Sequence, residues 1–583
     1  MGFPAGLLSA AWICFVVAIL LCFFVAVFFV RRYQKKAYSE RPVTVIAVLS
    51  MFIVLLTMAL VPVDVYIVSS MKDDSGNYKE WASSTEQREE ITNAVLYGYY
   101  ALYGLITLFA FILLPFAYFY YEEGGDEEST PREKACTGVK YTLGFVFVCA
   151  VLLLVGGLVP FSNGTSDTNS TDFEKKIVNL AQDLKSTGLE NSLSFVISVL
   201  TMFGTLYAVL YTSYGLASVP IGMIRGFSSA KSESVQVRKR HTAASERSRA
   251  ARARNQVRPS GSSYKERRQM RQIEEEEKLL GDRLQKLEGV VSSKWQCCLQ
   301  AMKPFMTIFG ILFLLFSTFL VVTLFINSLD RILHSVGYKL GFALEKPRIT
   351  NPVDQAFIVF SEVFPFDYIV FALIVLYLVV CTIGGMRRVD IWCCWIKMYK
   401  VRPGRTEPQG VLMVAFLMMF CVLYLNTMVM SLAPQYVMFG SQKYNYTCTM
   451  TNTTQNGTNA TAFAAPGYAY DQVALPVLDD GNSTGNGSSD GNATMHYYCS
   501  GTCDFSLSED VDEGACMQTR ITLLLNRFIY KIWFFGDVYY GGNWLVVLMF
   551  FVGLLHACIK QRRSALDDYR DVDSDSSDDD ILA

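Results

Sequence analysis

"VLYGYYALYGLITLFAFILLPFAYFYYEE", residues 95–123, is the stretch that decides the fold. Tyr97 and Tyr99 stand near its start and Phe119 and Tyr121 near its end, with an almost unbroken apolar run between them. Two aromatic belts about twenty residues apart are typical of a helix that crosses ~30 Å of hydrocarbon, because aromatic rings favour both membrane interfaces. The pattern predicts a transmembrane helix over residues 94–120.

The rest of the chain repeats this pattern. Of its 583 residues 52% are hydrophobic and only 18% are charged, whereas a soluble domain usually carries about 25% charge. The composition and the block lengths predict an all-α polytopic membrane protein with about nine transmembrane helices. The other eight blocks are 7–30, 43–69, 139–160, 192–217, 305–327, 357–384, 410–433 and 538–558.

Charge sets the expected orientation. Arg31, Arg32, Lys35 and Lys36 follow the first block, which we interpret as a retained anchor because it lacks the basic start of a signal peptide. Since cytosolic flanks are rich in Lys and Arg, the N-terminus is predicted to be luminal and the C-terminus cytosolic. The expected regions are spans one to five in 1–217 with a luminal loop at 161–191, a basic and helical cytosolic loop at 218–304, spans six to eight in 305–433, a glycosylated luminal loop at 434–537, span nine at 538–558 and an acidic cytosolic tail at 559–583.

Glycosylation triplets support this orientation. All nine N-x-[ST] triplets fall in the two loops predicted to be luminal, where oligosaccharide transfer takes place. The stretch 445–494 is rich in Asn, Gly, Ser and Thr, and we expect it to be shielded by glycans and too polar to form a packed core. The candidate asparagines are Asn163, Asn169, Asn445, Asn452, Asn456, Asn459, Asn482, Asn486 and Asn492.

Four of the fifteen cysteines lie in the large loop predicted to be luminal. An even number in an oxidising compartment suggests two disulfides with three possible connectivities. We favour Cys503 with Cys516 and Cys448 with Cys499. The pairs 297–298 and 393–394 beside membrane segments are palmitoylation candidates, although buried or idle thiols are the favoured interpretation.

Motifs for catalysis, metal binding and nucleotide binding are missing from the sequence. It contains no H-E-x-x-H, no phosphate-binding loop and no pair of C-x-x-C motifs. We therefore predict no catalytic residue, no metal ligand and no tightly bound cofactor, and an ATP-driven step would need a partner. Three acids, Asp64, Glu362 and Asp367, lie in or near spans; a structural or interfacial role is favoured over a transport site.

The cytosolic loop has a basic part followed by a part with helical periodicity. "VRKRHTAASERSRAARARNQVR" (237–258) is expected to contact anionic lipid headgroups rather than nucleic acid. Residues 265–291 predict a helix with one apolar stripe, which needs the bundle, a second subunit or another protein to pack against. If the stripe packs against a second subunit, the protein is a homo-oligomer, most simply a dimer. The stripe consists of Ile273, Leu280, Leu284, Leu287 and Val291.

The acidic tail carries sorting-like motifs. Tyr569 to Val572 has the Y-x-x-Φ form read by clathrin adaptors, and Ile581 with Leu582 is similar to a dileucine signal. Ser576 and Ser577, each followed by Asp three residues later, are typical acidophilic kinase sites, and phosphorylation would add negative charge. The tail predicts sorting to the endolysosomal system.

Several segments together resemble a known family. They are residues 95–123, "KYTLGFVFVCAVLLLVGGLVP" (140–160), "VFPFDYI" (363–369), "SLAPQYVMFGSQ" (431–442) and "GNW" (542–544). They resemble the lysosomal cobalamin transport escort family, a group of limb-region-type multispan membrane proteins. The chain departs from the family in a more basic loop at 218–304 and a longer glycosylated loop.

The resemblance implies a function. It implies a lysosomal membrane protein, with endoplasmic reticulum and plasma membrane or clathrin vesicle pools, that assists export of cobalamin (vitamin B12). The route would be binding and targeting of a lysosomal ATP-binding cassette transporter, with links to a cytosolic cobalamin-processing chaperone and a clathrin adaptor. Cobalamin would be cargo, and its binding residues are unknown. A secondary transporter of cobalamin and an endocytic receptor are the alternatives.

Overall fold

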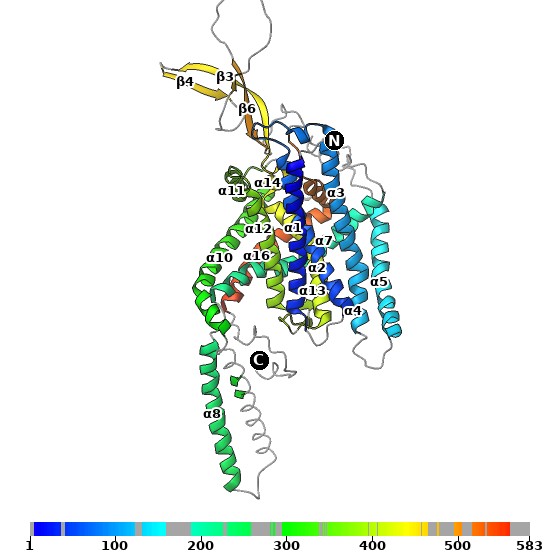
Figure 1. Cartoon of the computed structure of the whole chain (residues 1–583), viewed down its shortest axis with the longest axis vertical. Coiled ribbons are helices and arrows are strands. Elements are labelled where there is room, and N and C mark those ends of the chain that lie inside the picture. The colour runs from blue at the N-terminus through cyan, green and yellow to red at the C-terminus, as the bar shows by residue number, and fades with distance from the viewer. Residues whose placement is uncertain are drawn as a thin grey trace, which may run out of the picture.

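A computed structural model shows a bundle of long helices with a small sheet at one end and a helical projection at the other (Figure 1). We call these ends the sheet end and the α8 end. The structure describes residues 5–35, 41–122, 131–158, 188–225, 230–257, 280–281, 284–285, 294–335, 337, 342, 344, 347–393, 396–404, 406–455, 458–464, 475–476, 495–503, 516–530 and 533–559.

Nine helices among these residues are long and apolar enough to cross a membrane, which confirms the predicted fold class. They are α1 (Ala5–Tyr33), α2 (Arg41–Ser70), α3 (Thr85–Leu108) with its continuation α4 (Leu114–Glu122), α5 (Pro131–Leu158), α7 (Gly188–Arg225), α10 (Lys294–His334), α12 (Phe366–Val389), α13 (Pro408–Leu432) and α16 (Trp533–Ile559). Two further helices, α14 (Pro434–Phe439) and α15 (Arg520–Tyr530), connect the bundle to the sheet.

Two spans depart from regular helix, and a proline explains each departure. The third span contains a π-helical turn at Phe109–Leu113, just before Pro115. The expected seventh span, 357–384, is broken: α11 (Pro352–Phe360) ends before a turn, and α12 begins after Pro365. Proline has no N–H for the helix and its ring clashes with the preceding turn, which accounts for the wider turn before Pro115 and for the break before Pro365.

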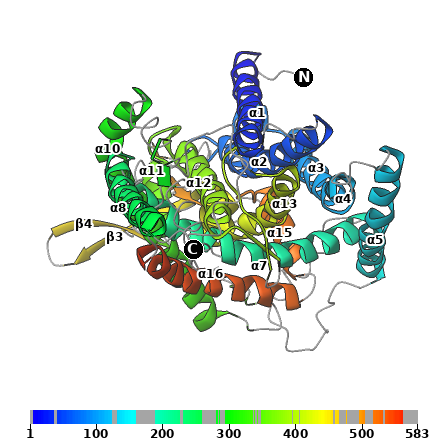
Figure 2. The ribbon, with the colours of Figure 1, turned by 90° about the horizontal axis from the view of Figure 1, so that it is seen from below.

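Helix α13 forms the centre of the bundle. In its most apolar window 89% of the residues are buried inside the protein, against 11% for α5 at the periphery. It packs against α7, α2, α4, α10 and α12, and the view along the bundle places it inside the ring of other helices (Figure 2). Its sequence is apolar all round, as expected of a helix with no face to water.

Helix α7 touches most of the other spans, and glycines allow the closest approaches. A Cβ on Gly215 would overlap the Cys381 carbonyl of α12, and one on Gly385 of α12 would overlap the Tyr211 carbonyl of α7. Small residues let helix backbones meet closely where no hydrophobic effect drives them together. Gly215 and Gly385 thus serve contact within the bundle.

A four-stranded antiparallel sheet lies at the sheet end. Its order is β4 (Thr458–Ala464), β3 (Lys443–Gln455), β6 (Met495–Thr502), β5 (Leu475–Pro476). Regular strands inside the polar stretch 445–494 were not predicted; its many β-branched threonines favour extended backbone. A two-stranded hairpin, β1 (Ile391–Cys393) and β2 (Ile396–Tyr399), joins α12 to α13.

The basic run of the loop 218–304 is itself helical. Helix α8 (Ala230–Val257) projects from the bundle along the long axis of the molecule (Figure 1). Leu280 and Leu284 of the predicted stripe are half-buried in short helical turns, and a Cβ on the neighbouring Gly281 would lie 3.4 Å from His241 Nε2 of α8. The turn that carries Leu280 therefore lies beside α8 of the same chain. Ile273, Leu287 and Val291 lie outside the described residues.

Candidate functional site

The chain leaves the bundle for the sheet after α13 and returns to it before α15. We call these two connections, residues 433–442 with Cys503 and residues 516–521, the junction. Helix α14 and Gly440 lead outward into β3, and Cys516 to Thr519 lead inward to α15. The junction is the candidate functional site because the chain runs between the spans and the sheet through these two connections.

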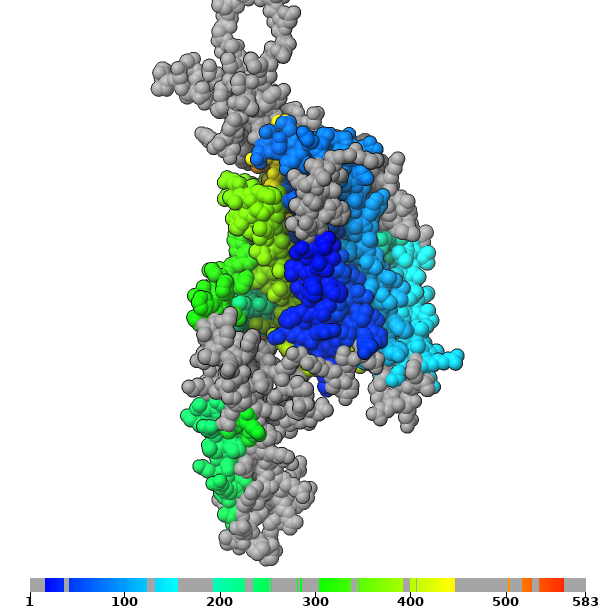
Figure 3. All heavy atoms as spheres, in the orientation of Figure 1, coloured from blue at the N-terminus to red at the C-terminus, as the bar shows by residue number. Residues whose placement is uncertain are grey.

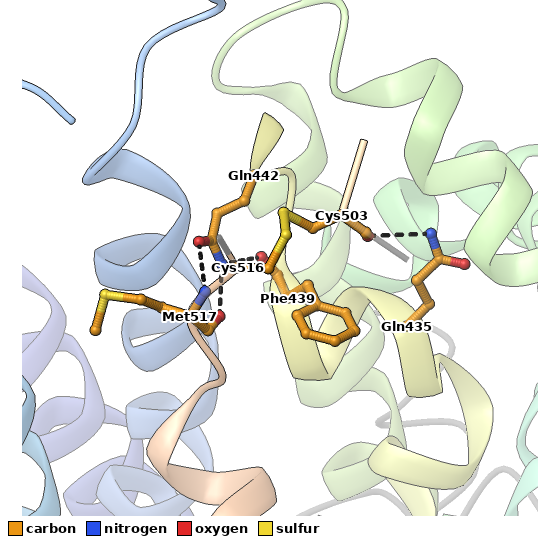
Figure 4. The surroundings of a disulfide bond; sticks show 6 residues. All are labelled: Gln435, Phe439, Gln442, Cys503, Cys516 and Met517. Carbon is orange, nitrogen blue, oxygen red and sulfur yellow. Dashed lines mark hydrogen bonds between the residues drawn. A yellow bond between two sulfur atoms is a disulfide. The ribbon is translucent and has the colours of Figure 1, made fainter. Parts of the chain in front are cut away.

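A disulfide and one glutamine tie the two connections together (Figure 4). Cys503 and Cys516 form a disulfide with 6.0 Å between their Cα atoms. Gln442 is buried; its Nε2 donates to the Met517 carbonyl (2.7 Å) and its Oε1 accepts from the Met517 N–H (3.1 Å). The Cys503 N–H donates to the Gln442 carbonyl (2.9 Å). The Gln442 side chain thus pairs with both the N–H and the carbonyl of Met517, which lies in the returning connection.

The junction continues with a second set of bonds closer to the bundle. The Thr519 N–H donates to the Met438 carbonyl (2.9 Å), and the Thr519 hydroxyl donates to the Val437 carbonyl (2.7 Å). Both carbonyls belong to α14, whose helix leaves its last carbonyls without internal partners. Thr519 is fully buried, so these bonds are shielded from water.

Asp64 of α2 anchors the start of α15. Its carboxylate is buried and accepts hydrogen bonds from the backbone N–H groups of Arg520 (3.3 Å) and Ile521 (2.8 Å). These are the unpaired donors at a helix N-terminus, where a negative charge is stabilised by the helix dipole. The Arg520 guanidinium also donates to the Thr92 hydroxyl of α3 (2.6 Å). Spans two and three are joined to α15 in this way.

Asp354 of α11 anchors the start of α14 in the same way. Its carboxylate accepts from the N–H groups of Gln435 (3.3 Å) and Tyr436 (3.0 Å). Burial raises the pKa of Asp354 to about 7, and the two backbone hydrogen bonds offset part of that rise. Desolvation disfavours the charged carboxylate, so this carboxyl changes protonation near neutral pH.

Tyr436 links the junction to α12. Its hydroxyl donates to the Asp367 carboxylate (3.0 Å), and its ring stacks on Phe357 with 4.1 Å between centroids. Nearby, the Ser441 N–H donates to the Ser69 hydroxyl of α2 (3.0 Å). Asp367 is buried, and its negative charge is therefore matched by a donor rather than left unpaired.

The three buried acids give the junction its chemical character. Asp64, Asp354 and Asp367 come from three different membrane-side helices, and each accepts hydrogen bonds from the junction. Glu362, the other acid considered from the sequence, is exposed in the turn before α12. Asp64 and Asp367 thus have structural partners in the junction. The described residues contain no group of three His, Cys, Asp or Glu side chains that could hold a metal ion.

The structure places the predicted glycosylation and disulfide residues unevenly. Asn445 is exposed at the start of β3, and its Nδ2 donates to Asn77 Oδ1 (2.7 Å). Asn452 and Asn459 lie on the paired strands β3 and β4. Cys448 and Cys499 lie on the adjacent strands β3 and β6, opposite Tyr497 and Tyr446; their side chains lie outside the described residues, so their pairing stays a prediction.

The remaining predicted site residues lie outside the described part of the chain. These are the other glycosylation candidates, the sorting residues and the phosphorylation candidates: Asn163, Asn169, Asn456, Asn482, Asn486, Asn492, Tyr569, Val572, Ile581, Leu582, Ser576 and Ser577.

Sequence reasoning missed Asp354, Gln442 and Arg520. One signal was present for Asp354: Asn351 followed by Pro352 is a helix start, and Asn351 does cap α11 by accepting from the Val353 N–H (2.8 Å). An acid in the first turn is common there, but its bonds to residues 435 and 436 are not visible in a local pattern. Gln442 ends the segment 431–442 that carried the family resemblance, but no local pattern pointed to its bonds with Met517, and Arg520 lay in none of the motifs.

Comparison with known proteins now identifies the family. A model of the LMBR1-like membrane protein matches residues 11–280. The chain is 38% identical over 584 residues to the probable lysosomal cobalamin transporter of Nematostella vectensis, with 100% of both chains covered. The chain belongs to the LMBR1-like membrane protein family. It is also 35% identical to the lysosomal cobalamin transport escort protein LMBD1 of Gallus gallus over 587 residues (100% of this chain, 99% of the relative) and of Homo sapiens over 579 residues (99% and 98%). No solved structure matches the chain significantly.

Membership of the LMBR1-like family confirms the resemblance drawn from the sequence. Two of the segments that carried that resemblance meet at the junction: 363–369 supplies Asp367, which accepts from Tyr436, and 431–442 supplies α14 and Gln442. A third, 542–544, supplies Asn543, which accepts a hydrogen bond from Tyr424 of α13 (3.0 Å). The motif residues therefore act as structural contacts of this LMBR1-like bundle.

Proposed function

We propose that this chain is a lysosomal membrane escort that assists the export of cobalamin from the lysosome to the cytosol by binding and targeting an ATP-binding cassette transporter. The observation that carries the proposal is the end-to-end similarity to proteins named lysosomal cobalamin transport escort protein. The sequence has no phosphate-binding loop, so the energy for export would come from the partner.

The junction supports an escort more than a carrier. A carrier coupled to an ion gradient needs ionisable groups that line a pathway and change partners. Here Asp64, Asp354 and Asp367 are held by backbone N–H groups or a tyrosine hydroxyl in positions that fix the sheet to the bundle. Movement of these groups would break contacts that hold the sheet to the bundle rather than release a substrate.

The outward face of helix α5 is the surface that we propose binds the transporter. It is the least buried of the nine spans, with 11% of its window buried, and side chains such as Phe147 (69% exposed) and Leu154 (66% exposed) face outward. Contact between spans needs close packing of apolar and small residues rather than charge.

Two measurements test the escort proposal together. The purified chain is reconstituted in liposomes with and without the transporter and ATP, and the transporter is localised in cells that lack this chain. An escort predicts no cobalamin flux from the chain alone and a transporter that stays in the endoplasmic reticulum without it. Normal arrival of the transporter at the lysosome in those cells would contradict the proposal.

A secondary transporter is the second candidate. The relative from Nematostella vectensis carries the name probable lysosomal cobalamin transporter, which favours direct transport. Cobalamin flux through the purified chain alone, sensitive to a proton gradient, would establish this alternative and overturn the escort.

The proposal extends to traffic and to cytosolic partners. Tail binding by a clathrin adaptor would sustain minor pools at the plasma membrane and in clathrin vesicles, besides the endoplasmic reticulum pool, and a cytosolic cobalamin-processing chaperone would receive the cargo. Replacement Tyr569→Ala together with Ile581→Ala and Leu582→Ala should move the chain toward the cell surface. An unchanged distribution would remove the adaptor from the proposal.

A further inference from the structure

Helix α8 presents basic side chains to solvent. Its inner stripe, Val237, Ala244 and Ser248, is buried on the side where the helical turns at 280–285 pack. Its other faces carry exposed basic residues even with the whole chain in place. They are Lys239, Arg240, Arg247 and Arg249.

The position of these residues argues against a lipid partner. Helix α8 extends away from the bundle along the long axis, and the space-filling view shows it as a narrow projection (Figure 3). Arg249 is nineteen residues from Ala230 at the start of α8, which is about 28 Å along a helix at 1.5 Å per residue. Attraction to headgroups decays over a Debye length of about 8 Å at physiological salt. The distal arginines are therefore too far from the surface to be held by it.

The root of the tail lies beside the root of α8. Arg225, the last residue of α7, donates through Nη1 to the Ala557 carbonyl of α16 (2.8 Å) and through Nη2 to the Cys558 carbonyl. The Tyr214 hydroxyl bonds to His556 Nδ1 (2.9 Å). Helix α8 begins five residues after Arg225, and both ribbon views place the end of α16 near it (Figures 1 and 2).

The tail has the charge and the length to cover α8. Residues 564–583 contain eight aspartates and one arginine. The 24 residues after α16 (560–583) can span up to roughly 80 Å at ~3.3 Å each, whereas the 28 residues of α8 are about 42 Å long. Tethering at a neighbouring root gives an effective concentration on the order of millimolar.

We propose that the exposed basic face of α8 is the docking surface for the acidic tail of the same chain, residues 564–583. The tail lies along Lys239, Arg240, Arg247 and Arg249 through charge pairing. Tyr569, Ile581 and Leu582 are then held on α8 and are not available to bind another protein. Phosphate on Ser576 or Ser577 adds negative charge and strengthens the docking. The docking does not depend on the proposed function.

Photo-crosslinking in the full-length chain tests this proposal. Ala250, exposed on the outer side of α8, is replaced by a photoreactive benzoylphenylalanine in protein reconstituted in nanodiscs that contain phosphatidylserine. Mass spectrometry then identifies what it captures. We expect peptides from 564–583 of the same chain, in a yield that does not change with protein concentration and that falls as salt is raised to ~1 M.

Two sets of matched variants test whether the docking depends on the positive charge of α8 or only on its helical structure. Arg240→Gln, Arg247→Gln and Arg249→Gln together should lower the tail crosslink at least about fivefold, whereas Lys at the same three positions should retain it. Gln and Lys have helix propensities close to that of Arg, so α8 is preserved in both sets. Ser576→Asp with Ser577→Asp should raise the yield. Capture of phospholipid, of residues 274–277 or of a second chain in place of the tail would overturn the proposal.

Discussion

At the scale of single residues, the buried acids of the junction work through backbone donors. Asp64→Ala would leave the N–H groups of Arg520 and Ile521 without acceptors inside the protein. We expect a loss of roughly 2–6 kcal/mol in the free energy of unfolding, because each of the two buried unsatisfied donors costs about 1–3 kcal/mol. Thermal unfolding in mild detergent measures it. Glu362→Gln, an exposed acid of the same region, is the control and should change little.

The second acid gives a pH dependence. The pKa of Asp354 is raised from its ordinary value of 3.8 to about 7, so the folded state binds the proton more tightly than the unfolded chain does. Its contribution to stability is fully present below about pH 4 and is lost as pH rises through 7, by at most about 1.4 kcal/mol per pH unit. Asp354→Asn cannot titrate and should flatten the stability curve between pH 4 and 7. An identical slope in the variant would contradict this assignment.

At the scale of elements, the disulfide controls how firmly the sheet is held. Cys503 and Cys516 close a loop of 13 residues in sequence separation, and closing a loop of that size contributes about 3 kcal/mol. Replacing both by serine should make the sheet and the chain between the two cysteines more sensitive to protease while the bundle stays folded. Limited proteolysis of the detergent-purified chain measures this. Cys558→Ser, at an exposed free cysteine, should leave the digestion pattern unchanged.

The contact between α7 and α12 depends on a missing side chain. Gly385→Ala would press a methyl group into the Tyr211 backbone carbonyl, which cannot turn aside as a flexible side chain could. We expect destabilisation of about 1–3 kcal/mol from overpacking. Gly144→Ala on α5 meets no atom within 4 Å and should be neutral or gain up to about 1 kcal/mol from helix propensity. Equal melting temperatures for the two variants would refute the close approach.

The sequence predicted those structural features whose signal lies within one short segment of the chain, and it missed contacts between distant segments. Apolar blocks of about twenty residues fixed the nine spans, and Pro365 explains the one break because a proline acts on its own helix. The pairing of Asp64 with Arg520 joins residues 456 positions apart, and no periodicity encodes it. The basic part of the loop was assigned by charge alone, although its many alanines and arginines are strong helix formers. The sheet was not predicted because its threonine-rich strands are polar on both faces and lack the alternation of apolar and polar residues that marks a strand with one buried face.

At the scale of the whole molecule, the start of α1 and the sheet lie at the same end of the bundle (Figure 1). The predicted orientation places both of them in the lumen. Glycosidase treatment should therefore increase the mobility of the full-length chain on gels. Asn445→Gln with the same change at its six loop companions should remove most of that shift, whereas Asn77→Gln, which alters the hydrogen-bond partner of Asn445 and no triplet, should leave it. A chain without glycans in cells would contradict the orientation.

The burial of α13 also has a consequence for how the protein is made. The most enclosed helix is the eighth of the nine spans to be synthesised, after about 400 residues that need it as their centre. At roughly 5–20 residues per second, the first span waits on the order of tens of seconds in the membrane before α13 is made. Lipid or an insertion chaperone must occupy the place of α13 until Pro408–Leu432 emerges, and a ribosome that stalls before this point leaves a set of helices with nothing to close upon.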